Sequence, residues 1–135
     1  MSDGSWDLQK VVFGLLEMAL DVRVYAPAPQ NAKLPYVDIA ESDATSDDVQ
    51  CRRGLDETLT IHVWTPLGRP AGSQALAKQI MSTIRDALHA KALEVPGRSS
   101  AFAFVTASRL FADDDDAAMH GVVTLRVNHH GPEEG

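Results

Sequence analysis

Residues 57–64, Glu-Thr-Leu-Thr-Ile-His-Val-Trp, alternate between aliphatic and polar or aromatic side chains, and this pattern restricts the fold more than any other. In an extended chain Leu59, Ile61 and Val63 point to one side. His62 and Trp64 point to the other. This is the period of a strand that has one face packed on a core. The chain must therefore contain segments that cover the aliphatic face.

Two segments have the helical spacing that such a cover requires. Apolar residues recur every three or four positions from Trp6 to Leu20. A second segment runs from about Pro70, acceptable in a first helical turn, to about Ala90. Its apolar residues repeat in steps of four: Leu76, Ile80, Ile84 and Leu88. We expect two amphipathic helices.

Other segments predict further strands and the connections between them. The expected strands are a short one at 22–25 and longer ones at 35–41, 101–111 and 121–128. The polar stretch 42–54 has Val49 as its only aliphatic residue before the closing glycine, which favours a mobile loop or an arm that becomes ordered on a neighbour. Residues 112–117 should form an acidic hairpin turn, and the chain should end in a disordered tail from about residue 129.

This order of elements predicts an α+β fold. We expect a mainly antiparallel sheet of four to five strands, with two helices packed on one face. Residues 1–135 should form a single domain, because 44% of them are hydrophobic and a chain of this length can bury one core.

Charge and the N-terminus restrict where the protein works. The formal net charge of −7 argues against a surface that binds DNA phosphates. No apolar run approaches the roughly 20 residues of a membrane helix. The first residues lack the basic and apolar regions of a signal peptide. We therefore expect a protein that is made in the cytoplasm and has no membrane partner.

No segment has the spacing of a catalytic, cofactor-binding or metal-binding motif. The glycine-containing segment 68–73 lacks the lysine and the spacing of a phosphate-binding loop. Cys51, the single cysteine, has neither a disulfide partner nor an adjacent histidine. The aspartates 113–116 suggest either a site for a hard cation or a solvated acidic turn, and their divergent directions favour the turn. We expect no catalytic residue, cofactor or metal.

His62 and Trp64 share the strand face opposite the aliphatic residues. Either another part of the fold covers that face, or the face is an interaction surface, for which exposed tryptophan is a favoured anchor. Both interpretations stay open at this point.

A series of short segments, in order, resembles a known family. The segments are 23–25 (Arg-Val-Tyr), 28–30 (Ala-Pro-Gln), 34–37 (Leu-Pro-Tyr-Val), 58–64 (Thr-Leu-Thr-Ile-His-Val-Trp), 84–89 (Ile-Arg-Asp-Ala-Leu-His) and 120–123 (His-Gly-Val-Val). From about residue 8 to 128 the chain is similar to the tail-completion, or tail terminator, proteins of long-tailed phages and gene transfer agents, relatives of the lambda-type tail terminator. The loop 42–54 is longer and more charged than the family pattern.

The resemblance implies a structural virion protein without catalytic residues. Its expected partners are copies of itself in a hexameric ring, the tail tube protein and the head-tail connector or stopper protein. The ring would sit in the tail or neck of the virion, end tube polymerisation and join the tail to the head. DNA would pass through the lumen without specific binding. A small hydrolase or nucleotide-binding enzyme and a cytosolic adaptor protein are the alternatives.

Within this interpretation we expect two groups of interface residues. Opposite charges lie close together in the loop, so they can pair with an adjacent subunit or with the tail tube. The second group is the polar and aromatic face of the strand. The residues are Asp47, Asp48, Arg52, Arg53, His62 and Trp64.

Overall fold

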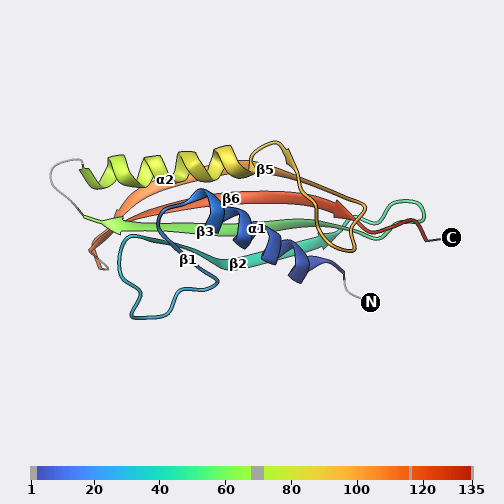
Figure 1. The fold of residues 1–135 in the computed structure, drawn as a ribbon, viewed down its shortest axis with the longest axis horizontal. Coiled ribbons are helices and arrows are strands. Elements are labelled where there is room, and N and C mark those ends of the chain that lie inside the picture. Colours follow the sequence, from blue (N-terminus) through green and yellow to red (C-terminus); the bar gives the residue numbers. More distant parts are fainter. Residues whose placement is uncertain (1–2, 68–71, 116, 135) are drawn as a thin grey trace.

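One long, curved sheet extends along the molecule, and both helices lie against the same face of it (Figure 1). The computed structural model describes residues 3–67, 72–115 and 117–134. The helices are α1 (Ser5–Ala19) and α2 (Gly72–Leu88). The strands are β1 (Arg23–Tyr25), β2 (Tyr36–Ser46), β3 (Gly54–Pro66), β4 (Lys91–Ala92), β5 (Ser100–Asp113) and β6 (Ala118–His130).

The sheet has the strand order β1-β2-β3-β6-β5-β4. The β1–β2 pair is parallel and the other pairs are antiparallel. The predicted α+β class with two helices on one face is confirmed. The predicted count of four to five strands is wrong, because the described residues form a sheet of six. The strand that was not predicted is β4, whose two residues are too few to show a period.

The aliphatic residues of the long strands form the core beneath the helices. Leu59, Ile61 and Val63 of β3 are fully buried, as the alternation predicted. The helices cover them with residues from one stripe each: Leu8, Val12 and Leu16 from α1, and Ile80, Ile84 and Leu88 from α2. Burial of these side chains is the main force that holds both helices on the sheet.

Both ends of α1 and the end of α2 have local causes. Helix α1 follows Gly4, whose φ of 86° is a left-handed conformation that glycine adopts readily. It ends where Leu20 turns to the extended conformation, while the Leu20 N–H still donates to the Leu16 carbonyl. After α2, Ala90 has a φ of 56°, which reverses the chain into β4. The predicted start of α2 at Pro70 falls outside the described residues.

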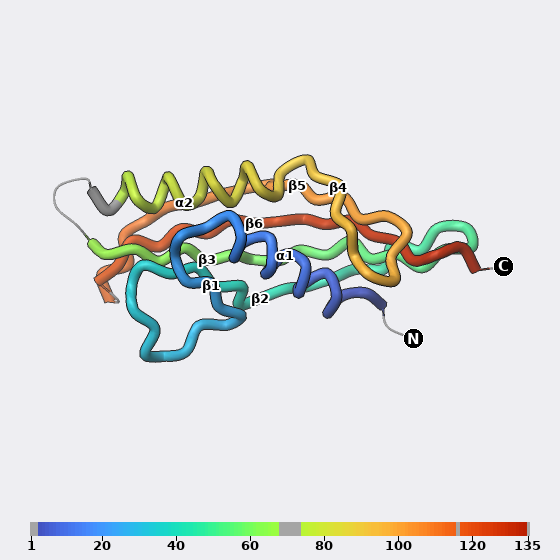
Figure 2. The backbone as a smooth tube through the Cα atoms, in the orientation of Figure 1, coloured from blue at the N-terminus to red at the C-terminus, as the bar shows by residue number. Residues whose placement is uncertain are grey.

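The segment 42–54 is ordered within the chain, which corrects the prediction of a mobile loop. Residues up to Ser46 continue β2 and pair with β3, in a register that places Ser46 opposite Leu55. Backbone hydrogen bonds across the hairpin, rather than buried side chains, stabilise this extension, because all residues from 40 to 46 are exposed. Figure 2 shows the resulting hairpin tip at the same end of the molecule as the C-terminus.

The disordered tail was predicted to begin at about residue 129, which is too early in the chain. His129 and His130 are part of β6, and His129 is fully buried. Beyond them the Gly131 N–H donates to the Arg53 carbonyl at 2.8 Å, and the Glu134 N–H donates to the Cys51 carbonyl. At the other end of the sheet the predicted turn at 112–117 is narrower, since Asp113 already pairs with Ala118. Asp116 lies outside the described residues.

Candidate assembly surfaces

The interface residues predicted from the sequence lie on two separate surfaces. Asp47, Asp48, Arg52 and Arg53 are at the tip of the β2–β3 hairpin. We call residues 47–53, which connect the end of β2 to the start of β3, the arm. His62 and Trp64 lie near the other end of β3, on the face of the sheet without helices.

The aspartates of the arm have partners within the chain. The Asp47 carboxylate accepts a hydrogen bond from the Asn128 side chain at 2.7 Å and lies 3.2 Å from Nε2 of His130. Its backbone N–H donates to the Gly54 carbonyl, and the Asp48 carboxylate accepts from the Gly54 N–H at 3.0 Å. These contacts hold the arm against β6.

The arginines of the arm are more exposed. Arg52 and Val49 are joined by two backbone hydrogen bonds of 3.0 Å that close the tip. The Arg53 guanidinium lies 3.4 Å from the Glu134 carboxylate, and its side chain is 79% exposed. Both guanidinium groups are therefore accessible to a partner, as a charged contact surface requires.

The face without helices carries a row of aromatic side chains, one from each of five strands. Cross-strand register places Tyr36, Trp64, His120 and Phe111 opposite one another, and the Tyr25 ring meets the edge of Tyr36. The Trp64 and His120 rings stack with centroids 3.7 Å apart. We call Tyr25, Tyr36, Trp64, His120 and Phe111 the aromatic row. All five are half-buried, so each ring exposes part of its surface on this face.

His62 connects His120 of the aromatic row to Glu41 of β2. Its Nδ1 is 2.7 Å from His120 Nε2, and its Nε2 is 2.7 Å from the Glu41 carboxylate. The carboxylate accepts the proton on Nε2, which leaves Nδ1 as the acceptor from the His120 ring. Neither helix covers this face of the sheet, and its role as an interaction surface stays a prediction.

The loop between β1 and β2 reaches one border of the row. Asp38 is on the same face as His62 and is 7% exposed. One of its carboxylate oxygens accepts the Ala28 N–H at 3.1 Å, which fastens the loop to the sheet.

An ion pair between β3 and β6 supplies a pH-dependent contact on this face. Arg126 donates through Nε to Asp56 at 2.8 Å and through its terminal nitrogen to the second oxygen. The hydrogen bond from Arg126 holds the pKa of Asp56 below its ordinary value. Asp56→Asn is expected to cost less than about 1 kcal/mol near neutral pH, because exposed pairs contribute little.

The sign of the pH dependence follows from the lowered pKa. The pair stabilises the folded state above the ordinary aspartate pKa of about 3.9, and this contribution is lost as pH falls through the lower folded value. Urea unfolding at a series of pH values is the measurement. The difference in unfolding free energy between the wild type and Asp56→Asn should shrink on acidification, and a difference that grows instead would contradict the assignment.

A buried polar cluster lies on the opposite face, beneath the start of α1. Glu57 and His129 are 2% and 0% exposed, and their side chains are 3.0 Å apart. Arg98 Nε donates to His129 Nδ1 at 2.9 Å, so Nε2 carries the ring proton and donates it to Glu57. The Ser5 hydroxyl donates to the other Glu57 oxygen at 2.6 Å. Burial lowers the pKa of Arg98.

This cluster is built to hold segments together. Ser5 and His129 bind the same carboxylate, so the ring is not placed to take a proton from the hydroxyl, as nucleophilic catalysis requires. Arg98 also donates to the carbonyls of Arg53 and His129. It therefore ties the turn before β5 to β6 and to the base of the arm, while the Ser5 hydroxyl ties α1 to the same cluster.

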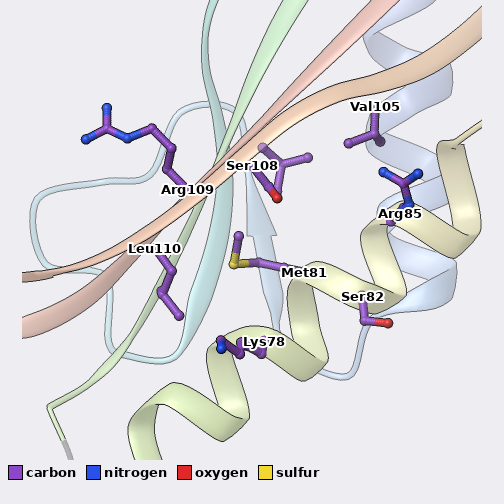
Figure 3. Close-up of a pocket in the computed structure, with 9 residues that line it drawn as sticks. Lys78, Met81, Ser82, Arg85, Val105, Ser108, Arg109 and Leu110 are labelled. Carbon is purple, nitrogen blue, oxygen red and sulfur yellow. The ribbon is translucent and has the colours of Figure 1, made fainter.

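A cleft of about 390 Å³ lies between α2 and β5 (Figure 3). Its cations are Lys78 and Arg85 on α2 and Arg109 on β5. In Figure 3 the Arg109 side chain extends away from the helix, and its guanidinium lies over the Phe111 ring, 5.2 Å from the centroid. Within residues 3–67, 72–115 and 117–134, none of these three cations forms an ion pair. The cleft is therefore a positively charged border of the sheet.

The described part of the chain contains no group of three or more His, Cys, Asp or Glu side chains placed to hold a metal ion. Its helices are also too short or too polar to cross a membrane.

Comparison with known proteins agrees with this architecture. The family model described as tail completion protein gp17 matches residues 13–130. No curated protein matches the chain. Among solved structures, a chain from the virion of a native gene transfer agent particle has a similar fold, with a TM-score of 0.67 and 18% sequence identity. The alignment covers 96% of this chain and 92% of that one. Because the family match spans most of the sequence, the chain belongs to the tail completion protein gp17 family.

Proposed function

We propose that this protein is a ring-forming subunit at the head-proximal end of a phage-type tail. Six copies end the polymerisation of the tail tube and join it to the head connector or stopper protein. Family membership makes the chain a structural protein of the virion tail. The ring, its position and its partners are the proposal, and the family match over residues 13–130 is the observation that carries it.

Several features of the molecule support an assembly role rather than catalysis. Both borders of the sheet have backbone that no described strand pairs with, and such backbone can form hydrogen bonds with a strand of another chain. The charged side chains that are buried are used to hold the fold together. A net charge of −7 suits a conduit through which DNA passes without binding.

The arm and the aromatic row are the proposed contact surfaces of this subunit. Arg52 and Arg53 present exposed cations at one end of the molecule, for an adjacent subunit or the tail tube. Near the other end, Trp64 and His62 present stacked rings that suit a flat contact with another virion protein.

Deletion of the gene followed by complementation tests the proposal. Without the protein, electron micrographs should show heads and tails that are not joined, and tubes of irregular length. The wild-type gene should restore joined particles. Arg52→Glu together with Arg53→Glu should restore far fewer, because the exposed cations of the arm become anions facing the same partner. Arg23→Glu with Lys33→Glu makes the same charge change at exposed positions outside the arm and serves as the control.

Particles with joined tails of normal length in the deletion strain would disprove the proposed function. If the arm variant joins tails as well as the wild type does, the role of Arg52 and Arg53 is wrong, but the ring is not.

A further inference from the structure

Each border of the sheet is covered over only part of its length. Strand β1 pairs with β2 at residues 36–38, which leaves the outer side of residues 41–46 without a partner strand among those described. Strand β4 pairs with β5 at Phe102 and Ala103, and the Val105 N–H donates to His89. Beyond that point, residues 107–112 have no described strand on their outer side. We call 41–46 and 107–112 the free edges.

The two free edges lie at opposite ends of the sheet. Residues 41–46 are near the arm, because Ser46 pairs with Leu55 at the start of β3. Residues 107–112 are near the far hairpin, because Ala112 pairs with Met119. Two copies placed side by side with a stagger along the strands can therefore join these edges without a clash between β1 of one and β4 of the other. Each free edge is six residues long, or about 20 Å.

The strand directions fit such a junction. β2 is antiparallel to β3, β3 to β6 and β6 to β5, so β2 and β5 run in opposite directions. Copies arranged in the same orientation bring β2 of one beside β5 of the next as an antiparallel pair. The sheet then continues from subunit to subunit with its helices on one side, as a closed head-to-tail ring requires.

The charges on the two edges are complementary. On the face without helices, the free edge of β2 carries Glu41 and Asp43, both exposed, and that of β5 carries Arg109. On the helix side β5 is flanked by Lys78 and Arg85, which line the cleft. The helix side of the β2 edge has only the short side chains of Ser42, Ala44 and Ser46, which leave room for α2 of a neighbour.

The geometry points to an antiparallel junction between residues 41–46 of one copy and residues 107–112 of the next, with Asp43 opposite Arg109. In this register Thr45 faces Ala107, and Glu41 faces Phe111, the last ring of the aromatic row. Backbone hydrogen bonds would hold neighbouring copies together, and the pair of Asp43 and Arg109 would fix the register between them. This inference rests on the proposed function, since it states how the ring is made.

Cysteine cross-linking in assembled tails tests the junction. Within one subunit β3 and β6 separate β2 from β5, so positions 43 and 109 are at least about 14 Å apart, at about 4.8 Å per strand, and cannot form an internal disulfide. In a Cys51→Ser background, Asp43→Cys with Arg109→Cys should give a ladder of cross-linked copies on oxidation. Asp43→Cys with Arg126→Cys, on the central strand β6, is the matched control and should give none.

A charge exchange gives a second readout that does not depend on cysteine chemistry. Asp43→Arg or Arg109→Asp alone should reduce the number of head-joined particles about tenfold, the effect of losing about 1.4 kcal/mol of binding free energy. The two together should restore most of that loss. Asp21→Arg, an equal charge change at an exposed site after α1, should have little effect.

The outcomes separate the inference from the proposed function. Rings at the tail end without a 43–109 cross-link, and without rescue by the charge exchange, overturn the junction and leave the ring. A cross-link from the thiol of the Arg109→Cys variant to the tail tube protein alone overturns it too, since the edge then pairs with a different protein. Normal joined tails without the gene overturn the proposed function itself.

Discussion

Replacing Glu57 by alanine is expected to lower the free energy of unfolding by about 3–5 kcal/mol. The carboxylate accepts hydrogen bonds from His129 and Ser5 in a part of the core where Glu57 is 2% exposed. Without it, the donors of His129 and Ser5 lose their partner and the charge on Arg98 loses a nearby anion. An unpaired charge or donor in the core costs far more than the same group at the surface.

Urea unfolding measured by circular dichroism checks this value. Glu94→Ala removes an exposed carboxylate and should change the unfolding free energy by no more than about 0.5 kcal/mol. In a double-mutant cycle, Glu57→Ala with Arg98→Ala should lower the unfolding free energy by less than the sum of the two single changes. Once one of the two charged side chains is removed, removing the other no longer leaves an unpaired charge in the cluster. Additive losses would mean that the cluster does not act as a unit.

The elements with a strong hydrophobic period were predictable from the sequence. The alternation of residues 57–64 correctly assigned Leu59, Ile61 and Val63 to the core, and the four-residue steps after Pro70 correctly assigned Ile80, Ile84 and Leu88. Both patterns work because burial on one face imposes its period on the side chains. The second half of β2 has no such pattern, since both of its faces are exposed and only its backbone pairs with β3.

The buried cluster was missed for a different reason. Glu57 and His129 are 72 residues apart in the chain, and each looks like the polar end of a strand. Their burial depends on β3 lying beside β6 in one register, with α1 and the turn at Arg98 closing over them. A useful signal is the strict alternation of Val123, Leu125 and Val127, which if extended by one step places His129 on the core side.

The placement of part of the proposed interface was predictable in the same sense. The period of β3 correctly placed His62 and Trp64 on one face, opposite the core. It gave no sign that Tyr36, His120 and Phe111 would align with them, because that alignment is a property of strand register. The roles of Asp47 and Asp48 between subunits stay a prediction, and both carboxylates already have partners within the chain.

Consecutive histidines connect the core of this protein to its arm. Because side chains alternate along a strand, His129 points to the cluster under α1 and His130 to the other side of β6. His130 Nε2 lies 2.9 Å from the Asp47 carbonyl, and its ring lies against Gly54. The arm is therefore anchored on β6 directly beside the buried cluster.

Replacing Gly54 by alanine is expected to release the arm while the core stays folded. A Cβ at this position would collide with the backbone oxygen of Asp47 and with the His130 ring. The backbone oxygen cannot move away without breaking the hairpin, so the change should cost about 1–3 kcal/mol, as overpacking does. Hydrogen exchange should show faster exchange in residues 46–54 and little change in β3 and β6 beyond them. Head-joined particles should fall with it, if the arm makes the proposed contact.

Gly14→Ala is the matched control for this change, and its expected sign is opposite. Gly14 lies inside α1, and nothing lies within 4 Å of the place where its Cβ would be. Alanine there should stabilise the protein by about 0.5–1 kcal/mol, because glycine in a helix loses more conformational freedom on folding. The same added methyl group thus separates a steric effect at the arm from a general effect of removing glycine. Equal destabilisation by both changes, or normal protection of residues 46–54 in Gly54→Ala, would show that close packing at Gly54 does not hold the arm.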